Sequence, residues 1–501
     1  MFYNSLLNNK KMKTIKMLGF LLVFCWQAQA QTQIVWKKCL GTAAFDLIGG
    51  VTKTKTNKLI LAGEMNYKGK LIKMDMQGNT IWDKTYGGIG YDGFAKAIEM
   101  PNGDLIAYGN TGSSNMPNYV GGTDFWVMRT DSNGVLLWQS AYGEQYTDLA
   151  SSIDFIDGKL LVSGNSDTYW MGGPPVGSPI ERSLIVTINP NNGAAINTAF
   201  MYGATYSIKK TFNNTSNPSR YWWITWAQNM PEGLLDMDTT ALSSTPPTSQ
   251  WAYRRQSYIS DAIYNNNGLD FIFVGITYDT LRCPSINPTY AGYQQTIFKT
   301  DTAMQVLKWR TCIPSLGGSI LRYIVPSADG MYYAAGDGRM NEQWDNNFWL
   351  LKFDENGTII WQDTYGGTKE EYLGGITLGQ TPGEIILAGV TKSNDGDVAG
   401  SGFHGNYDGW VIKVKDQAMV SVTDAEKSGA WRVSPLAGSQ YQVNFLGDLT
   451  KYPVRMVLTD ALGQELRSYT AQSAQLVIDL SEYTQGIYFL RSTYGAEKLL
   501  R

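Results

Sequence analysis

Histidine and cysteine are almost missing from this chain of 501 residues, which contains one histidine and four cysteines. A Ser-His-Asp triad would have to use His404, and no Gly-x-Ser-x-Gly motif accompanies it. One histidine and scattered cysteines also fail to supply the four ligands of a structural zinc ion. The residue types therefore argue against histidine-dependent hydrolysis and zinc sites, and they leave paired carboxylates as the remaining acid–base chemistry.

Charged residues are scarce as well, at 17%, and the formal net charge is −3. Nucleic-acid binding proteins carry a concentrated basic surface, so we expect no nucleic-acid partner. Long apolar runs are missing too. The apolar segment from Met17 to Trp26 is about half of the roughly 20 residues that span a bilayer, so no transmembrane segment is expected.

Residues 1–30 are typical of a secretory signal peptide. Lys11, Lys13 and Lys16 precede the apolar segment, and Ala28-Gln-Ala30 places small residues at a cleavage point. The mature chain is therefore expected to begin at Gln31 and to be exported. Of the three cysteines that remain, Cys283 and Cys312 either pair in an oxidising compartment or stay, with Cys39, as buried thiols.

Glycine (53), tyrosine (30) and tryptophan (16) are abundant, which favours many short strands joined by turns. A strand–turn–strand pattern recurs, with a tryptophan four residues after the glycine of the turn. The clear copies run from Asp75 to Gly88, from Asp131 to Glu144 and from Asp354 to Gly367. A unit of this length cannot bury its apolar face alone, so the copies must pack against one another.

The tryptophan marks seven equivalent positions, one of them degenerate: Trp36, Trp82, Trp138, Asn197, Trp251, Trp309 and Trp361. Four strands per unit at this spacing indicate the blade of a β-propeller. We expect the repeated tryptophans to pack one blade against the next, each contributing a few kcal/mol.

The last unit stops at Asp416 without its tryptophan strand, and Ile34 to Gly41 supplies such a strand from the other end of the chain. Donating it would close the ring and remove unpaired strand edges. We therefore predict an all-β chain: a seven-bladed β-propeller closed by an N-terminal strand (residues 31–418), a linker (419–430) and a small C-terminal β-sandwich (431–501).

The C-terminal segment resembles a known family. Val457 to Leu466 (VLTDALGQEL), Ile478 to Ser481, Gly486 to Leu490 and the terminal Lys498 to Arg501 look like the type A C-terminal sorting domain of the type IX secretion system. The resemblance implies that the secretion machinery and a sortase-like protease are partners. It also implies that the protein is released, or attached to the outer membrane at the cell surface. The repeats are similar to propellers found with such domains, a likeness that concerns fold and implies no activity.

The long loops of the propeller fall between the second and third strands of five units, which places them at one end of the blades. Variable loops on a rigid scaffold often carry function, so this loop-rich face is the expected working face. The long loops are Asn110 to Thr123, Asn165 to Arg182, Tyr278 to Gln294, Asp337 to Asn347 and Thr391 to Tyr407.

Five acids lie ten residues after the tryptophan positions: Asp46, Asp92, Asp148, Asp261 and Glu371. Around the channel mouth they would bind a cation or sugar hydroxyls. The structural alternative is that each acid only satisfies backbone amides where a strand begins, and repetition favours that alternative.

The loop Ser393-Asn-Asp-Gly-Asp397, with Asp408 beyond it, is rich in oxygen ligands. It suggests a possible calcium site at Asp395, Asp397 and Asp408, although it lacks the spacing of an EF-hand; no other cofactor is expected. Trp170 and Trp344 are candidates for stacking on sugar rings, and packing between blades is the alternative use for them.

Two functional hypotheses follow. The first is a secreted or surface-displayed, noncatalytic propeller that binds a glycan or a protein through its loop-rich face. The second is a glycan-processing hydrolase that uses the carboxylates at the channel mouth, and it requires those carboxylates to point into the channel.

Overall fold

The computed structural model describes residues 31–156, 158–167, 181–202, 211–213, 220–225, 233–238, 257–266, 268–277, 294–301, 306–313, 319–339, 345–417, 431–436, 438–445, 454–460, 464–471, 475–492 and 495–501. The predicted signal peptide (1–30) and linker (419–430) lie outside these residues. So do Trp170, Trp251, Cys283 and Trp344.

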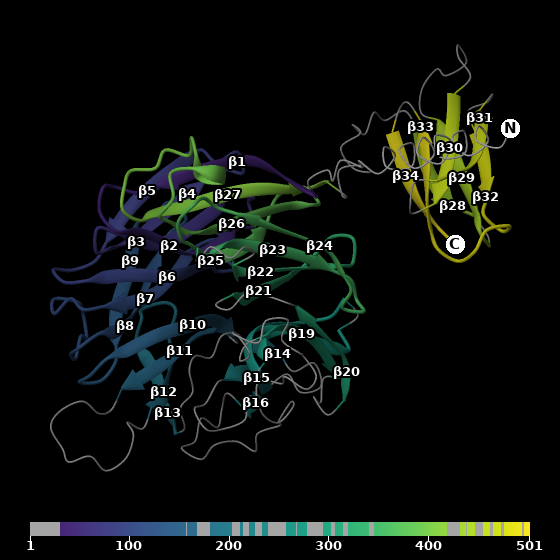
Figure 1. Ribbon diagram of the computed structural model, residues 1–501. Helices are drawn as coiled ribbons and strands as arrows, with labels where there is room; N and C mark the ends of the chain where they lie inside the picture. Colours follow the sequence, from purple (N-terminus) through teal and green to yellow (C-terminus); the bar gives the residue numbers. More distant parts are fainter. Residues whose placement is uncertain are drawn as a thin grey trace, which may run out of the picture.

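Residues 31–417 form an all-β chain in which sheets follow one another along the sequence, as predicted (Figure 1). In the described residues, the first to third sheets contain four antiparallel strands each. They are β2 (Asp46–Lys53), β3 (Leu59–Met65), β4 (Lys68–Met74) and β5 (Thr80–Tyr86); β6 (Asp92–Glu99), β7 (Leu105–Thr111), β8 (Asp124–Thr130) and β9 (Leu136–Tyr142); and β10 (Asp148–Ile156), β11 (Lys159–Asp167), β12 (Glu181–Ile188) and β13 (Ala195–Tyr202).

The fourth to sixth sheets continue this order. They are β14 (Thr211–Asn213), β15 (Arg220–Thr225) and β16 (Gly233–Asp238); β17 (Ser257–Tyr264), β18 (Asp270–Thr277), β19 (Gln294–Asp301) and β20 (Leu307–Ile313); and β21 (Ile320–Pro326), β22 (Tyr332–Gly338), β23 (Asn347–Phe353) and β24 (Ile359–Tyr365). The last sheet contains β25 (Glu371–Leu378), β26 (Glu384–Thr391) and β27 (Asp408–Asp416), with the short 3-10 helix η2 (Gly396–Val398) in the loop after β26.

The N-terminal strand β1 (Thr32–Leu40) completes the last sheet, as the sequence predicts. It pairs antiparallel with β27 from Thr32–Asp416 to Leu40–Gly409, so that strands from opposite ends of the sequence lie side by side in Figure 1. The first strand of the first sheet, β2, then packs against β25, β26 and β27 of the last sheet. Apolar clusters lie between neighbouring sheets, and Ile48, Leu61 and Val411 belong to the cluster between the first and last sheets.

Four of the repeated tryptophans pack against the glycine turn of the next sheet, as predicted: Trp36, Trp82, Trp138 and Trp309. Trp36 lies against the Gly78 turn, where φ is +84° and a Cβ on Gly78 would come within 3.1 Å of the indole. The indole nitrogen of Trp36 donates to the Met76 carbonyl (3.0 Å), and that of Trp309 donates to the Glu355 carbonyl (3.0 Å). The turn glycine is therefore required both for its conformation and for its contact with an aromatic ring.

Strand register confirms the degenerate copy at Asn197. Trp82, Trp138 and Trp361 each pair with the third-strand residue that precedes a register shift, and Asn197 pairs with Thr187 at the same point. Trp309 occupies the same place in the fifth sheet, and Trp36 occupies it in the last sheet, where β1 pairs with β27. Six of the seven marked positions are therefore equivalent, and the seventh, Trp251, lies outside the described residues.

The C-terminal segment forms two antiparallel sheets that share one apolar core. The three-stranded sheet contains β28 (Trp431–Pro435), β29 (Gln440–Phe445) and β32 (Gln475–Asp479). The four-stranded sheet contains β30 (Val454–Asp460), β31 (Glu465–Ala471), β33 (Ile487–Ser492) and β34 (Gly495–Leu500). Val443 and Ile478 from the first sheet pack with Leu458 and Leu490 from the second, which is the arrangement of a small β-sandwich.

Cys39 is a buried free thiol, whereas Cys312 is disulfide-bonded. The alternative in which all three mature cysteines are free is therefore wrong. The pairing with Cys283, which lies outside the described residues, stays a prediction. Within the described residues, no helix has the length and apolar character needed to cross a membrane.

Candidate functional site

Four of the five predicted acids begin the first strand of a sheet, and all four are buried. Asp46, Asp92, Asp148 and Glu371 are at most 1% exposed. Each accepts a hydrogen bond from the backbone amide four residues earlier; the donor lies 2.8 Å away at Gly88, 2.6 Å at Glu144 and 3.0 Å at Gly367, and Thr42 donates in the same way. The acids therefore stabilise the backbone turns that connect one sheet to the next, and their carboxylates do not face solvent.

The third strands of the second and last sheets use an acid in the same way, a repetition that the tryptophan spacing did not reveal. Asp124 accepts from the Val120 amide (2.7 Å) and Asp408 from the His404 amide (2.7 Å). Asp124 also lies across Gly143 from Asp148, where a Cβ would come within 2.5 Å of one carboxylate and 2.6 Å of the other. Burial and the nearby Asp148 charge raise the pKa of Asp124 to about 6.

Asp261 does not occupy the predicted position, which corrects the sequence alignment of the fifth sheet. In the first strands of the first, second and last sheets, a register shift follows three residues after the acid, at Gly49, Ala95 and Gly374. In β17 the shift falls at Ser260, so the equivalent position is Ser257. Asp261 lies inside the strand and accepts from the Ile324 amide of the next sheet (3.0 Å).

The loop predicted to bind calcium, Ser393 to Asp397, forms hydrogen bonds with the connection between β24 and β25; this contact is called a clasp below. Asp395 accepts from the Thr368 amide (2.8 Å) and hydroxyl (2.7 Å), and Asp397 from the Gly366 amide (3.2 Å). Asp408 lies apart from them, bound to His404. Within the described residues no group of three or more His, Cys, Asp or Glu side chains is arranged to hold a metal ion. Calcium at these residues stays a prediction.

The same clasp occurs in the second sheet, which explains the sequence Thr-x-Ser-x-Asn/Asp. Ser393 accepts from the Lys369 amide (2.9 Å), as Ser113 accepts from the Gly90 amide (2.8 Å). Thr391 donates to Glu371 (2.7 Å), as Thr111 donates to Asp92 (2.5 Å). In both sheets, the loop between the second and third strands therefore covers the gap to the preceding sheet.

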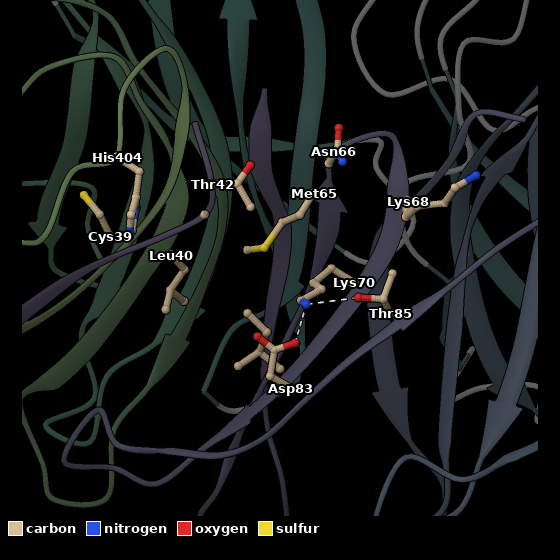
Figure 2. Close-up of a pocket in the computed structure, with 12 residues that line it drawn as sticks. Cys39, Leu40, Thr42, Met65, Asn66, Lys68, Lys70, Asp83, Thr85 and His404 are labelled. Carbon is tan, nitrogen blue, oxygen red and sulfur yellow. Dashed lines mark hydrogen bonds and ion pairs between the residues drawn. The ribbon is translucent and has the colours of Figure 1, made fainter. Parts of the chain in front are cut away.

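The first sheet lacks this loop, because β3 and β4 are joined by the two-residue turn Asn66-Tyr67. The gap between the first and last sheets is consequently left open as a pocket of ≈ 460 Å³. Figure 2 shows its lining, with residues of β1 and His404 on one side and the β4–β5 hairpin on the other. The lining comprises Cys39, Leu40, Gly41, Thr42, Met65, Asn66, Lys68, Lys70, Ile72, Asp83, Thr85 and His404.

The polar part of the pocket comes from the β4–β5 hairpin. Lys70 forms an ion pair with Asp83 and donates to the Thr85 hydroxyl (3.1 Å), as Figure 2 shows. Lys68 is held by the carbonyls of Gly88 (2.6 Å) and Gly90 (2.5 Å). The half-buried Leu40 adds an apolar side chain to the lining. The pocket therefore offers paired donors and acceptors beside an apolar side chain.

Cys39 and His404 do not form a nucleophile–base pair in this pocket. The Cys39 side chain packs in the apolar core with Trp410 and Tyr365, and in Figure 2 it points away from Lys70 and Asp83. Burial, followed by the charges of Asp408 and Glu371, raises the pKa of its thiol to about 12. The thiolate that cysteine catalysis needs is thus disfavoured. His404 is bound to Asp408 through Nδ1 (2.9 Å).

The sequence predicts a working face at the loop-rich end of the sheets, and that face stays a prediction. The sequence does not single out the residues that line this pocket. Asp83 and Thr85 belong to the repeat copy from Asp75 to Gly88, where they have no distinguishing signal, and Lys70 lies outside the motif. Their proximity to His404 depends on the closure by β1. The available signal was negative: the first unit has a two-residue connection at the point where five other units are expected to have long loops. Trp170 and Trp344, the predicted stacking residues, lie outside the described residues.

No protein-family model matches the sequence, and no curated protein matches it. Solved structures with similar folds include hydrazine synthase of Kuenenia stuttgartiensis (8% identity, TM-score 0.46, 68% of this chain and 92% of that chain). They also include PorZ, a type IX secretion surface component of Porphyromonas gingivalis (10%, 0.43, 89% and 58%). A third is the α-L-arabinofuranosidase Arb93A of Fusarium graminearum (9%, 0.39, 77% and 98%).

Proposed function

We propose that this chain is a secreted or surface-displayed β-propeller of seven blades that binds a glycan, without catalysis, in the pocket between its first and last sheets. The ring model rests on the succession of sheets, on the N-terminal strand in the last sheet and on the packing of β2 against β25–β27. The proposed domains are a signal peptide (1–30), the propeller (31–418), a linker (419–430) and a C-terminal sorting domain (431–501).

The observation that carries the binding proposal is the uncovered gap lined by the Lys70–Asp83–Thr85 group and by Leu40. Sugar hydroxyls both donate and accept hydrogen bonds, and sugar rings also present C–H surface. A paired lysine and aspartate hold donor and acceptor in place, and the apolar Leu40 side chain suits the ring. The pocket volume falls within the range of about 300–1,000 Å³ that is usual for small-ligand sites.

The hydrolase alternative requires carboxylates that reach a substrate. Four of the predicted carboxylates are buried and accept hydrogen bonds from backbone amides, and the fifth, Asp261, lies inside a strand. The four are Asp46, Asp92, Asp148 and Glu371. No observation in the described residues favours this alternative, so we propose binding only.

A glycan array probed with the mature protein (residues 31–501) tests the proposed function. We expect binding that falls about tenfold or more in Lys70→Ala and Asp83→Ala, because each removes one partner of the ion pair that faces the ligand. Lys308→Ala is the matched control, since the exposed Lys308 forms an ion pair on the fifth sheet (2.5 Å) with the buried Asp270, which keeps a second ion pair with Lys299 (3.3 Å). Binding that is absent, or equal in all variants, contradicts the proposal.

The proposed sorting role of residues 431–501 rests on the sequence resemblance, and the sandwich described above is compatible with it. In the producing cell, a chain truncated after residue 430 should accumulate in the periplasm, while the full chain reaches the surface or medium. Fractionation and immunoblotting measure this. Equal surface or medium levels of the two chains would exclude a sorting role.

A further inference from the structure

Two exposed tyrosines lie beside the pocket, on the other flank of the Asn66-Tyr67 turn. Tyr67 is 57% exposed and Tyr91 is 47% exposed, whereas most large aromatic side chains in the described residues are buried or half-buried. Their ring centroids are 6.4 Å apart and their planes are inclined at 62°. The two rings therefore form the walls of a corner and not one flat surface.

The turn that carries Tyr67 has an unfavourable backbone conformation for a tyrosine. Asn66 and Tyr67 have φ values of +50° and +63°. Glycine or asparagine usually occupies the second position of such a turn, because a larger side chain at positive φ costs free energy. The turn is also fixed at both ends: Asn66 donates to Asp46 (3.0 Å), and the Tyr67 carbonyl accepts from the Asp92 amide (3.1 Å).

Tyr91 is held by a buried acid. The Tyr91 hydroxyl donates to Glu64 Oε2 (2.6 Å), while Glu64 Oε1 has no hydrogen-bond partner in the described residues, although Glu64 is only 3% exposed. Burial, the largest cause, raises the pKa of Glu64. An incompletely satisfied buried carboxyl is costly, and the interaction that it makes fixes the orientation of one exposed ring.

We infer that Tyr67 and Tyr91 form a second sugar-binding subsite, continuous with the pocket across the Asn66-Tyr67 turn, so that the ligand is an oligosaccharide chain and not a single sugar. The inference rests on the proposed glycan binding. One sugar unit occupies the pocket beside Lys70 and Asp83. A neighbouring unit places its C–H face on a tyrosine ring, a contact for which rigid aromatic surfaces are suited. Glu64 is a positioning residue, because it acts through Tyr91.

The test is calorimetric titration of the mature protein with mono- to hexasaccharides of the manno-, xylo-, cello- and chito-series. For the series that binds, we expect affinity to rise with chain length. Tyr67→Ala and Tyr91→Ala should each lower the affinity for the tetra- to hexasaccharides by about 3- to 10-fold, with little change for the monosaccharide. Lys70→Ala should weaken binding at every length.

Two further variants separate a binding role from a structural one. Tyr67→Gly removes the ring and relieves the backbone conformation, so its melting temperature should equal or exceed that of the wild type while oligosaccharide affinity falls. Tyr91→Phe keeps the ring but loses the bond to Glu64, and it should bind the longer chains more weakly than Glu64→Gln, in which an amide oxygen still accepts from Tyr91.

The outcomes are distinct. If the wild type shows no length dependence, or if the tyrosine variants bind the longer chains as it does, the second subsite is wrong while pocket-dependent binding stands. If the tyrosine variants instead lose capture of a protein partner and no oligosaccharide binding changes, the corner is a protein-docking surface and the inference fails. If no sugar of the four series binds, both this inference and the proposed glycan function fail.

Discussion

The gap between the first and last sheets differs from the gap between the first and second sheets in one feature, the length of a loop. The gap between the first and second sheets is covered by residues 112–123. Met116 of this loop is buried in the apolar cluster of that gap, and Ser113 accepts a hydrogen bond from the Gly90 amide. The gap between the first and last sheets has only the Asn66-Tyr67 turn, and there a pocket opens. The same scaffold can therefore be closed or open at each junction without a change in its strands.

The largest expected effect concerns the strand that forms one wall of the open gap. Deletion of residues 31–42 removes β1 and leaves β27 with an unpaired edge, so we expect aggregation or a fall in melting temperature of more than roughly 10 °C. Differential scanning calorimetry and size-exclusion chromatography measure this. An unchanged melting temperature would contradict the hypothesis that β1 closes the ring of sheets.

Grafting a long loop onto the first sheet should close the gap between the first and last sheets, as a loop closes the gap between the first and second sheets. Replacing Asn66-Tyr67 by the sequence of residues 112–123 places a loop with its Ser and Asn clasp over the pocket. Glycan affinity should fall by at least about tenfold through loss of access, while the thermal unfolding transition stays cooperative. Calorimetric titration and thermal unfolding provide the two readouts. Retained affinity in a well-folded graft would show that the ligand binds elsewhere.

The buried acids Asp124 and Asp148, on the second and third sheets, should have a smaller effect on the free energy of unfolding, and that effect should depend on pH. The pKa of Asp124 is about 6 in the folded protein against 3.8 for the free group, so the folded state keeps a proton that the unfolded state releases. Its stabilising contribution is complete below pH 3.8 and is lost as the pH rises through about 6. Relative to Asp124→Asn, the wild type should lose at most about 3 kcal/mol between pH 3.5 and pH 7.

Denaturant unfolding of the wild type and Asp124→Asn across this pH range measures the difference. A difference that grows in favour of the wild type as the pH rises would contradict the raised pKa.

The smallest effect concerns the clasps of the covered gaps. Ser113→Ala and Ser393→Ala each leave a backbone amide without its acceptor, which should cost about 1 kcal/mol. Ser132→Ala, in an exposed turn, should cost less and serves as the control. Urea unfolding gives the values. Equal values in all three variants would mean that the clasps do not stabilise the loops.

Much of the fold could be predicted because the repeat combines local and packing signals. The turn at Asp75 is local, since its carboxylate accepts from the Gln77 and Asn79 amides (2.9 and 2.8 Å). The tryptophan marks the contact with the next sheet, so counting it located the donated strand. Counting does not hold at Asp261, because the register shift of β17 falls just before this residue, whereas in other first strands it falls three residues after the acid.

The site was less predictable. The acids at the strand starts were found by spacing, but spacing does not reveal whether a carboxylate faces solvent or a backbone amide. The oxygen-rich loop at Ser393 suggests a possible calcium site, which stays a prediction. The structure shows a further role, in which Thr391 and Ser393 bind Glu371 and the Lys369 amide and Asp395 accepts from the Thr368 amide. The matching Thr111, Ser113 and Asn115 in the same sequence would have indicated a structural repeat.

By itself the sequence determined the all-β class, the succession of sheets and the N-terminal strand of the last sheet, because turn chemistry and the aromatic repeat act over short distances or recur at every sheet. Only the tertiary structure decided which junction is open. The pocket brings together Leu40 and His404 with Lys70 and Asp83, residues far apart in the chain. Their proximity follows from packing the first sheet against the last, and the two-residue turn at Asn66-Tyr67 leaves the space between them uncovered.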